Sequence, residues 1–185
     1  MRKLIYSMGV SLDGYIAARD GSIDWAAPDE ELHRFHNQQA REVGVHLYGR
    51  RLYEDMLPWE TAEQRPSASD AALEFAQIWK ATPKVVFSTT LETVEGNARL
   101  VRGDAVEEVA RLKQEPGEHL AVGGAGLAAT LIERGLVDEY RQFVNPVVLG
   151  GGTPYFPALE DQISLELVET RTFGSRVVYL RYRAG

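Results

Sequence analysis

The sequence predicts an α/β fold built around a mainly parallel sheet, formed by residues 1–185 as a single domain. Short apolar runs alternate with longer amphipathic segments along most of the chain, as expected when helices connect parallel strands. Two further apolar runs near the C-terminus follow each other without a helix between them, which predicts an antiparallel hairpin beside the parallel strands. The length of 185 residues is ordinary for one domain.

Apolar runs predict strands at residues 3–10, 15–17, 45–49, 84–90, 119–124 and 138–150, and in the hairpin at 164–183. Amphipathic segments predict helices at residues 28–44, 50–56, 67–83, 103–117 and 125–135. Pro28 suits the first turn of the first helix, and Gly44 suits its end. The apolar stripe of this helix comprises Leu32, Phe35, Ala40 and Val43, whereas Glu30, Arg34 and Asn37 are expected to face water.

Composition excludes several classes of function. The net charge is −7 and the isoelectric point about 5.2, which argues against nucleic acid or an anionic membrane as the main partner. The chain has no cysteine, so disulfides, thiolate nucleophiles and cysteine zinc sites are excluded. Neither a signal peptide nor an apolar run long enough for a membrane span is evident, and a cytoplasmic protein is expected.

Three glycines crowd the boundary between the predicted strand at 119–124 and the helix after it. A helix N-terminus presents free backbone N–H groups, and glycine lets a phosphate approach them, so a pyrophosphate suits the segment VGGAGL. A tight turn without a ligand explains the glycines equally well. Gly124, Gly126 and Ala129 fit the pattern G-x-G-x-x-A. The dinucleotide fold of that pattern is excluded, because no acidic residue ends the next strand and too little chain follows.

Arg50 and Arg51 stand at a second boundary between a strand and a helix, directly after Gly49. Two positive charges at a helix N-terminus oppose the helix dipole, and an external anion bound there would explain them. The alternative is a pair of solvated arginines. A third strand ends at Ser88, Thr89 and Thr90, whose hydroxyl and N–H groups suit another phosphate contact, although polar strand ends without a ligand are common. Three such strand ends predict one dinucleotide along the carboxyl edge of the sheet, with an extra negative group near the arginines.

Six segments occur in the order seen in the dihydrofolate reductase-like superfamily: SLDGYIA, DGSIDW, LYGRRLYEDM, VVFSTTL, AVGGAGL and NPVVLGGGTPYFP. Nearly the whole chain resembles the riboflavin-biosynthesis reductase (RibD C-terminal) branch, in a small stand-alone bacterial form. The resemblance implies a three-layer dihydrofolate reductase-like fold and an NADPH-dependent reductase that acts on a pterin- or pyrimidine-like heterocycle. The reference substrate of that branch is 5-amino-6-(5-phosphoribosylamino)uracil, an intermediate of riboflavin biosynthesis.

The resemblance also implies a set of cofactor-binding residues. Gly49 and Arg50 match the motif that meets the adenosine 2′-phosphate, with Arg51 nearby, while Leu52 replaces a threonine that other members often carry. The remaining positions that match the cofactor site of the family are Ile16, Ala17, Ser88, Thr89, Gly123, Gly124, Ala125, Gly126 and Leu127. Ile16 and Ala17 match the segment near the nicotinamide, and the glycines open the helix beneath the pyrophosphate.

Dihydrofolate reductases place a catalytic acid early in the first helix, a few residues after a tryptophan, and this likeness nominates Glu31. A solvated acidic face at the start of a helix is the simpler alternative. The loop at residues 150–157 is expected to be flexible and to close over a ligand. The expected substrate-binding residues are Asp24, Trp25, Phe35, Gly151 and Gly152.

Other residues predict less chemistry. His33 and His36 lie three residues apart, but no further ligand accompanies them, so surface histidines and no metal site are expected. Tyr53 and Trp59 either shape the pocket or pack in the core. Besides its small-molecule substrate, the expected partner is a second copy of the chain, in a homodimer paired through the C-terminal hairpin. A non-catalytic nucleotide-binding or ligand-sensing module on the same fold is the alternative function.

Overall fold

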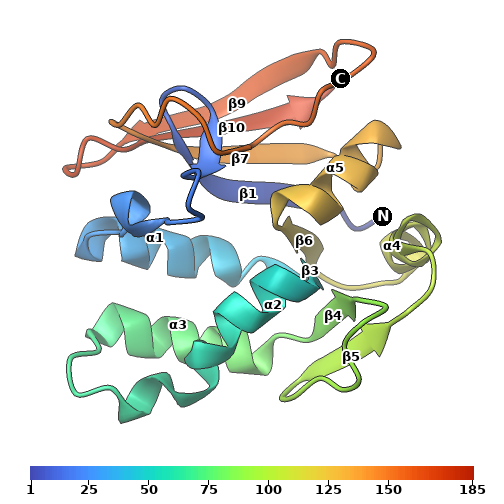
Figure 1. Cartoon of the computed structure of the whole chain (residues 1–185), viewed down its shortest axis with the longest axis horizontal. Coiled ribbons are helices and arrows are strands. Elements are labelled where there is room, and N and C mark those ends of the chain that lie inside the picture. The colour runs from blue at the N-terminus through green and yellow to red at the C-terminus, as the bar shows by residue number, and fades with distance from the viewer.

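Eight strands form one sheet in the order β5-β4-β3-β6-β1-β7-β10-β9, in a computed structural model that describes residues 1–185. The parallel strands are β1 (Leu4–Ser11), β3 (Val43–Gly49), β4 (Lys84–Phe87), β5 (Ala98–Val101), β6 (His119–Gly123) and β7 (Glu139–Asn145). The hairpin of β9 (Leu165–Thr172) and β10 (Val178–Ala184) continues the sheet antiparallel to β7. The predicted sheet, mainly parallel with an antiparallel C-terminal hairpin, is therefore confirmed (Figure 1).

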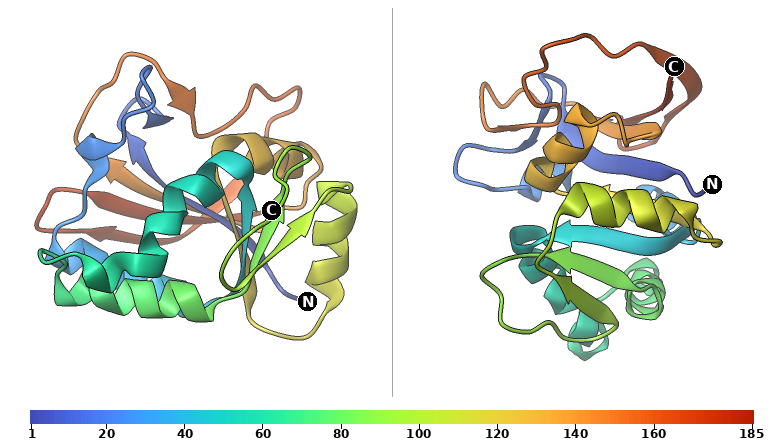
Figure 2. Two further views of the ribbon diagram at one scale, coloured as in Figure 1. Left: turned by 60° about the horizontal axis from the view of Figure 1, so that its bottom comes forward. Right: turned by 90° about the vertical axis from the view of Figure 1, so that its right-hand side faces the viewer.

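Helices cover both faces of this sheet and complete three layers (Figure 2). On one face α1 (Glu30–Ala40) and α3 (Asp70–Ala81) pack side by side, and Phe35 of α1 contacts Phe143 of β7. On the other face lie α4 (Ala105–Gln114) and α5 (Ala125–Glu133), with Leu131 of α5 in one buried cluster with Leu4 and Leu47. The predicted three-layer arrangement is confirmed by these layers. None of the helices combines the length and the apolar character that crossing a membrane requires.

Five short elements position the edge of the sheet. The helix α2 (Arg50–Met56) follows β3 without a loop and continues into a 3-10 helix, η2 (Leu57–Gln64). Between β1 and α1 the chain forms β2 (Tyr15–Ala17) and a single 3-10 turn, η1 (Asp24–Ala26). The strand β2 pairs with β8 (Thr153–Pro154), which brings the loop after β7 back to the end of β1.

Local differences from the sequence prediction have physical reasons. Helix α1 begins at Glu30, because the carboxylate of Asp29 caps it by accepting from the N–H of Leu32 (2.8 Å), so Pro28 lies outside it. Asn37, expected to face water, is completely buried, and its Nδ2 donates to the carbonyl of Ala71 (2.9 Å) in α3. The sequence does not predict strand β5, because it is only four residues long and has no clear apolar alternation.

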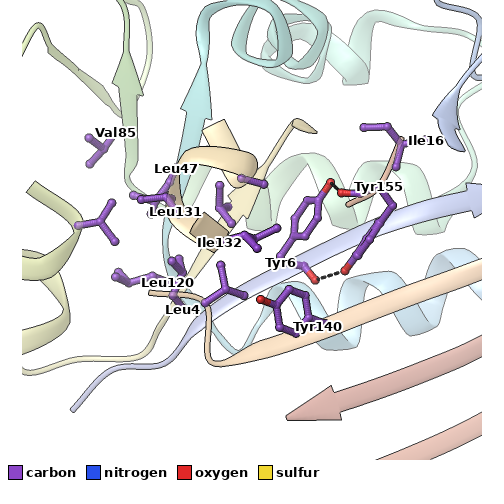
Figure 3. Packing of buried hydrophobic residues seen from close by; sticks show 14 of the residues in the cluster. Leu4, Tyr6, Ile16, Leu47, Val85, Leu120, Leu131, Ile132, Tyr140 and Tyr155 are labelled. Carbon is purple, nitrogen blue, oxygen red and sulfur yellow. Dashed lines mark hydrogen bonds between the residues drawn. The ribbon is translucent and has the colours of Figure 1, made fainter. Parts of the chain in front are cut away.

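The core on the α4 and α5 face is closed by two tyrosines (Figure 3). Tyr6 of β1 and Tyr155 stack with their ring centroids 4.3 Å apart. Each phenol donates to the backbone carbonyl of the other residue, at 3.1 Å and 3.0 Å. Burial raises the pKa of both phenols, so the hydroxyls stay protonated donors. The segment after β8 is thereby fixed to the central strand β1.

Candidate active site

Three strand ends meet at the carboxyl edge of the sheet. In the parallel register, Tyr48 of β3 lies beside Gly123 of β6, and Gly49 lies beside Phe87 of β4. The segments that follow are the N-termini of α2 and α5 and the turn after β4, so they lie at neighbouring positions. The structure therefore brings together the three phosphate-suited boundaries on which the sequence interpretation rests.

The glycines at the start of α5 differ in what requires them. A Cβ on Gly123 would collide with Cδ2 of Leu52, which crosses over from α2. Gly124 has a φ of +87°, a conformation that side chains other than glycine adopt with strain. Gly126 has no such reason, because a Cβ there would meet nothing within 4 Å. Only Gly126 keeps the open space above the helix start that a bound phosphate would need.

The helix start around these glycines exposes backbone donors. Gly124 is the N-cap of α5 and has no side chain with which to satisfy the first N–H groups of the helix. Ala125 and Leu127 occupy the first turn, and the first turn contains no acidic side chain. The unsatisfied N–H groups and the helix dipole together favour an anion at this place.

The two arginines after Gly49 point to different neighbours. The guanidinium of Arg50 donates to the carboxylate of Glu54 (2.8 Å) and to the hydroxyl of Thr90 (3.0 Å), which follows β4. Half of the Arg50 side chain is exposed, so it retains free N–H donors at the edge. Arg51 instead lies against the loop before η1, where a Cβ on Gly21 would come within 2.7 Å of its terminal nitrogen.

The turn after β4 is organised by Ser88. Its Oγ accepts from the N–H groups of Thr90 (3.2 Å) and Leu91 (3.1 Å), and its own N–H donates to Val101. Thr89 is exposed at the tip of this turn, and its carbonyl accepts from Arg102 (3.2 Å). The Ser88 hydroxyl thus shapes the turn, while the Thr89 side chain faces outward.

The segment at the end of β1 is held by a network of polar contacts. Ala17 of β2 pairs with Thr153 of β8, and Ile16 is buried in the main core. The carboxylate of Asp13 accepts from the N–H groups of Leu149 (3.0 Å) and Gly150 (2.7 Å). These bonds, with one from the Ser11 hydroxyl, lower the pKa of Asp13.

The predicted loop is therefore tied down at several points. Arg19 donates to the carbonyl of Gly150 (2.7 Å), and Gly151 and Gly152 follow with φ values of +148° and +141°. A Cβ on Gly152 would collide with the carbonyl of Ala17. Glycine at this position permits the close approach of β8 to β2, so the two glycines serve the backbone path beside the edge.

A cavity of about 500 Å³ opens beside these strand ends. It lies between the sheet and the helices α1, α2 and α3, and most of its lining is apolar. Leu52 and Gly123, which meet at the start of α5, both line the cavity, so the cavity adjoins the carboxyl edge of the sheet. Trp59 and Met56 line it near η2, whereas Tyr53 belongs to the core cluster against which both pack and does not line the cavity.

Histidines are the main titratable groups of the cavity wall. His33 and His36, expected at the surface, are partly buried and line the cavity, which corrects that expectation. They face inward because α1 lies across the cavity. His33, His36 and Ala40, which also lines the cavity, are spaced by three and four residues, and this sequence pattern places all three on one side of the helix. Burial, together with His33, lowers the pKa of His36 to about 4. Burial and the nearby Lys84 lower the pKa of His46, on β3, to about 4.

A buried, ion-paired arginine lines the cavity. Arg141 is 2% exposed and donates to the carboxylates of Glu139 (2.7 Å) and Glu42 (2.9 Å), and to the side chain of Gln39. Burial alone would raise the pKa of Glu139, but Arg181 and Arg141 outweigh it, so the pKa lies below its ordinary value. Sequence reasoning missed this network, because its members come from α1, the turn after it and two strands.

The nominated catalytic and substrate residues lie elsewhere. The carboxylate of Glu31 accepts from Arg171 (3.1 Å) and from the N–H of Gly174 (3.2 Å), so it holds the C-terminal hairpin and does not line the cavity. Phe35 is buried in an aromatic cluster with Phe143 and Phe173. These side chains of α1 face the hairpin because they are offset around the helix from His33 and His36.

The residues of η1 also stay outside the cavity lining. Asp24 is exposed, and Trp25 is partly buried, with its indole N–H donating to the carbonyl of Ser22 (3.1 Å). From the segment between η1 and α1, Pro28 lines the cavity instead. No group of three or more histidine, cysteine or acidic side chains is arranged to hold a metal ion.

The chain is similar to several known proteins in sequence and in fold. The "Uncharacterized protein YyaP" of Bacillus subtilis (strain 168) is 36% identical over 184 residues, covering 98% of this chain and 94% of that protein. A solved structure from Shewanella sp. PV-4, named for riboflavin biosynthesis, is 23% identical with a TM-score of 0.77, covering 100% of this chain and 99% of that one. Dihydrofolate reductase from Enterococcus faecalis, complexed with NADP(H), is 14% identical with a TM-score of 0.63, covering 99% and 96%.

The two structures show likeness of fold, whereas the sequence comparison shows the family. The pattern of the RibD C-terminal domain matches residues 2–179, almost the whole chain. The chain therefore belongs to the RibD C-terminal domain family, a membership that supports a reductase-type function.

Proposed function

We propose that this protein is an NADPH-dependent reductase that transfers a hydride to a pterin- or pyrimidine-like heterocycle. The observation that carries the proposal is the shared wall of the cavity and the strand-end edge at Leu52 and Gly123. A dinucleotide along the edge and an acceptor in the cavity would then lie in contact. Bound NADPH supplies the hydride, and the protein supplies binding and orientation.

The residues of the edge fit a phosphorylated dinucleotide. The free N–H groups at the start of α5, with the open space above Gly126, suit the pyrophosphate. Arg50 at the start of α2 has exposed donors for the adenosine 2′-phosphate, and Thr90 and Glu54 orient its guanidinium. Ile16 and Ala17 with the tied loop of Gly151 and Gly152 are proposed to border the nicotinamide end.

The catalytic assignment of Glu31 stays a prediction from the sequence. Its carboxylate is engaged by Arg171 and by the backbone of Gly174, and no acidic residue lines the cavity. A direct check is to compare turnover of Glu31→Gln with that of the unmodified protein. Loss of turnover with unchanged stability would support Glu31, whereas lower stability with turnover retained would support its observed contact with the hairpin.

The experiment that tests the function compares two cofactors. Purified protein is titrated with NADPH and with NADH, and binding is followed through cofactor fluorescence. Arg50→Ala should weaken NADPH by about 1.5–3 kcal/mol, the loss of a hydrogen bond to a charged group, and should leave NADH almost unchanged. Oxidation of NADPH in the presence of a panel of pterins and pyrimidines then measures turnover.

The matched control is Arg34→Ala, which removes the same charge from an exposed ion pair on α1, far from the edge. This variant should bind NADPH as the unmodified protein does. Equal loss of NADPH and NADH binding in Arg50→Ala would contradict the assignment of the 2′-phosphate. Binding of neither cofactor to the unmodified protein would reject the proposal, and binding without any turnover would favour the ligand-sensing alternative.

A further inference from the structure

We propose that the cavity takes a flat, uncharged aromatic heterocycle and excludes acceptors that place a phosphate or carboxylate inside it. This inference rests on the proposed function, since it names the substrate class of the same site. It follows from three properties of the cavity: its aromatic walls, its balanced charge, and the neutral hydrogen-bonding groups that have no partner in the protein.

The walls suit a planar ring system. Trp59 and Phe75 meet edge to face with their centroids 4.7 Å apart, and Phe143 of β7 also lines the cavity. Their flat surfaces, with Met8 and Met56, are mostly apolar. A volume of about 500 Å³ is within the range of pockets that hold small organic ligands. A ring system of two or three fused rings would bury most of its surface here.

The charge of the cavity is already balanced. Arg141 is the one cationic side chain of the lining, apart from the histidines, and its three nitrogens donate to Glu139, Glu42 and Gln39. The two carboxylates compensate the guanidinium, so no free positive charge faces the cavity. His36 and His46 are neutral at pH 7, because burial lowers the pKa of each to about 4. A buried anionic group would therefore lose its hydration without gaining a counter-charge.

Neutral polar atoms remain available to a ligand. The Nε2 of His46 is fully buried and has no hydrogen-bond partner in the protein. Ser7 and His36 also line the cavity, and neither side chain makes a hydrogen bond to another residue of the chain. Buried polar atoms in native proteins are usually satisfied, so the Nε2 of His46 calls for a partner on a ligand. The hydroxyl of Ser7 and the imidazole of His36 are only partly buried, and both are free to bond to ligand partners. Ring carbonyl, ring nitrogen and ring N–H groups of an uncharged heterocycle would supply them.

The test uses probe pairs that differ mainly in charge. The first pair is 6-hydroxymethylpterin and pterin-6-carboxylate, and the second is 6-methyluracil and orotate, which is uracil-6-carboxylate. In both pairs the carboxylate is bonded directly to a ring carbon, so it must enter the cavity together with the ring. Calorimetric titration of the full chain at pH 7 should show that an uncharged member binds on the order of tenfold or more tightly than its carboxylate.

Variants locate the preference in the cavity. Glu42→Gln removes one of the carboxylates that compensate Arg141, so it should reduce the discrimination against the carboxylate probe several-fold. Glu30→Gln, an equal change of charge on the exposed side of α1, should leave the discrimination unchanged. Ser7→Ala and His46→Phe should each weaken the uncharged probe. If His46→Phe fails to fold, Ser7→Ala carries the same comparison.

The outcomes separate this inference from the proposed function. Equal or tighter binding of the carboxylates, or no binding of any probe, would overturn the inference even where NADPH binds and is oxidised. Binding of uncharged probes without any binding of NADPH would reject the proposed function and leave the inference standing. An unchanged discrimination in Glu42→Gln would show that charge balance at Arg141 is not its cause.

Discussion

Two glycines at the start of α5 have different roles: Gly124 is needed for folding, and Gly126 is proposed to be needed for binding. Gly124 is required by its φ of +87°, whereas Gly126 lies in the first turn of the helix, and a methyl group on its Cα would meet nothing within 4 Å. The two positions therefore respond in opposite ways to the same change. Alanine in a helix interior is favoured over glycine, because it loses less backbone entropy on folding.

Gly126→Ala is expected to stabilise the free protein by about 0.5–1 kcal/mol and to weaken NADPH binding, since the methyl group would fill the space above the helix start. Gly124→Ala is expected to destabilise it by about 1–3 kcal/mol. Denaturant unfolding and cofactor titration of both variants measure the two effects. Full NADPH affinity in Gly126→Ala would show that no phosphate approaches this turn.

The buried histidines predict how stability depends on pH. In the unfolded chain His36 and His46 take up a proton near pH 6.5, whereas in the folded chain they do so only near pH 4. The unfolded state binds more protons in this interval, so stability falls as the pH falls from 6.5 towards 4. Each histidine contributes a slope of up to about 1.4 kcal/mol per pH unit.

His36→Phe should reduce this slope, measured by urea unfolding at pH 7, 5.5 and 4.5. The variant and the unmodified protein share all their carboxylates, so the difference between their slopes belongs to the imidazole of His36. A slope identical to that of the unmodified protein would mean that the imidazole of His36 reaches water in the folded state.

At the scale of elements, α2 and β6 are fitted to each other through one contact. Leu52 of α2 packs where a Cβ of Gly123 would stand, so Gly123→Ala should cost about 1–3 kcal/mol through overpacking. Leu52→Ala in the Gly123→Ala background should recover part of that loss. A double-mutant cycle by chemical denaturation measures the coupling energy. Strictly additive losses would show that the two residues do not compete for space.

The sequence predicts the sheet and the strand-end residues well, because each depends on a local pattern. Because all parallel strands of a sheet end at the same edge, Gly49 and Gly124, which follow two such strands, are expected at one edge. The cavity lining could not be predicted in this way, because it depends on which neighbouring elements cover each side of α1. Phe35 faces the hairpin, His36 faces the cavity, and Asn37 faces α3, so three neighbouring residues are buried for three different reasons. One apolar stripe cannot indicate three contacts, and the Arg141 network, assembled across the chain, leaves no periodic signal.

At the scale of the whole molecule, the sheet has two unequal edges (Figure 1). The edge strand β5 is short, whereas β9 has eight residues and exposes Leu167 (51%) and Val168 (45%). A long edge strand with exposed apolar side chains is a surface for pairing with another chain. The homodimer expected from the sequence is therefore predicted to form through β9.

Sedimentation equilibrium should show a dimer for the unmodified protein and a monomer for the double variant Leu167→Lys, Val168→Lys, whose charges would repel across the pairing. Leu12→Lys, which changes another exposed apolar residue away from β9, serves as the control and should leave the dimer intact. A monomer in the unmodified protein would reject the prediction.

The paired tyrosines of Figure 3 connect the interior to the surface that borders the proposed nicotinamide end. Because Tyr155 is hydrogen-bonded to Tyr6 of β1 and its neighbours Thr153 and Pro154 pair with β2, this border cannot become mobile while the core stays folded. Warming should therefore leave the proposed binding site intact until the whole molecule unfolds, with no lower temperature at which the loop alone unfolds.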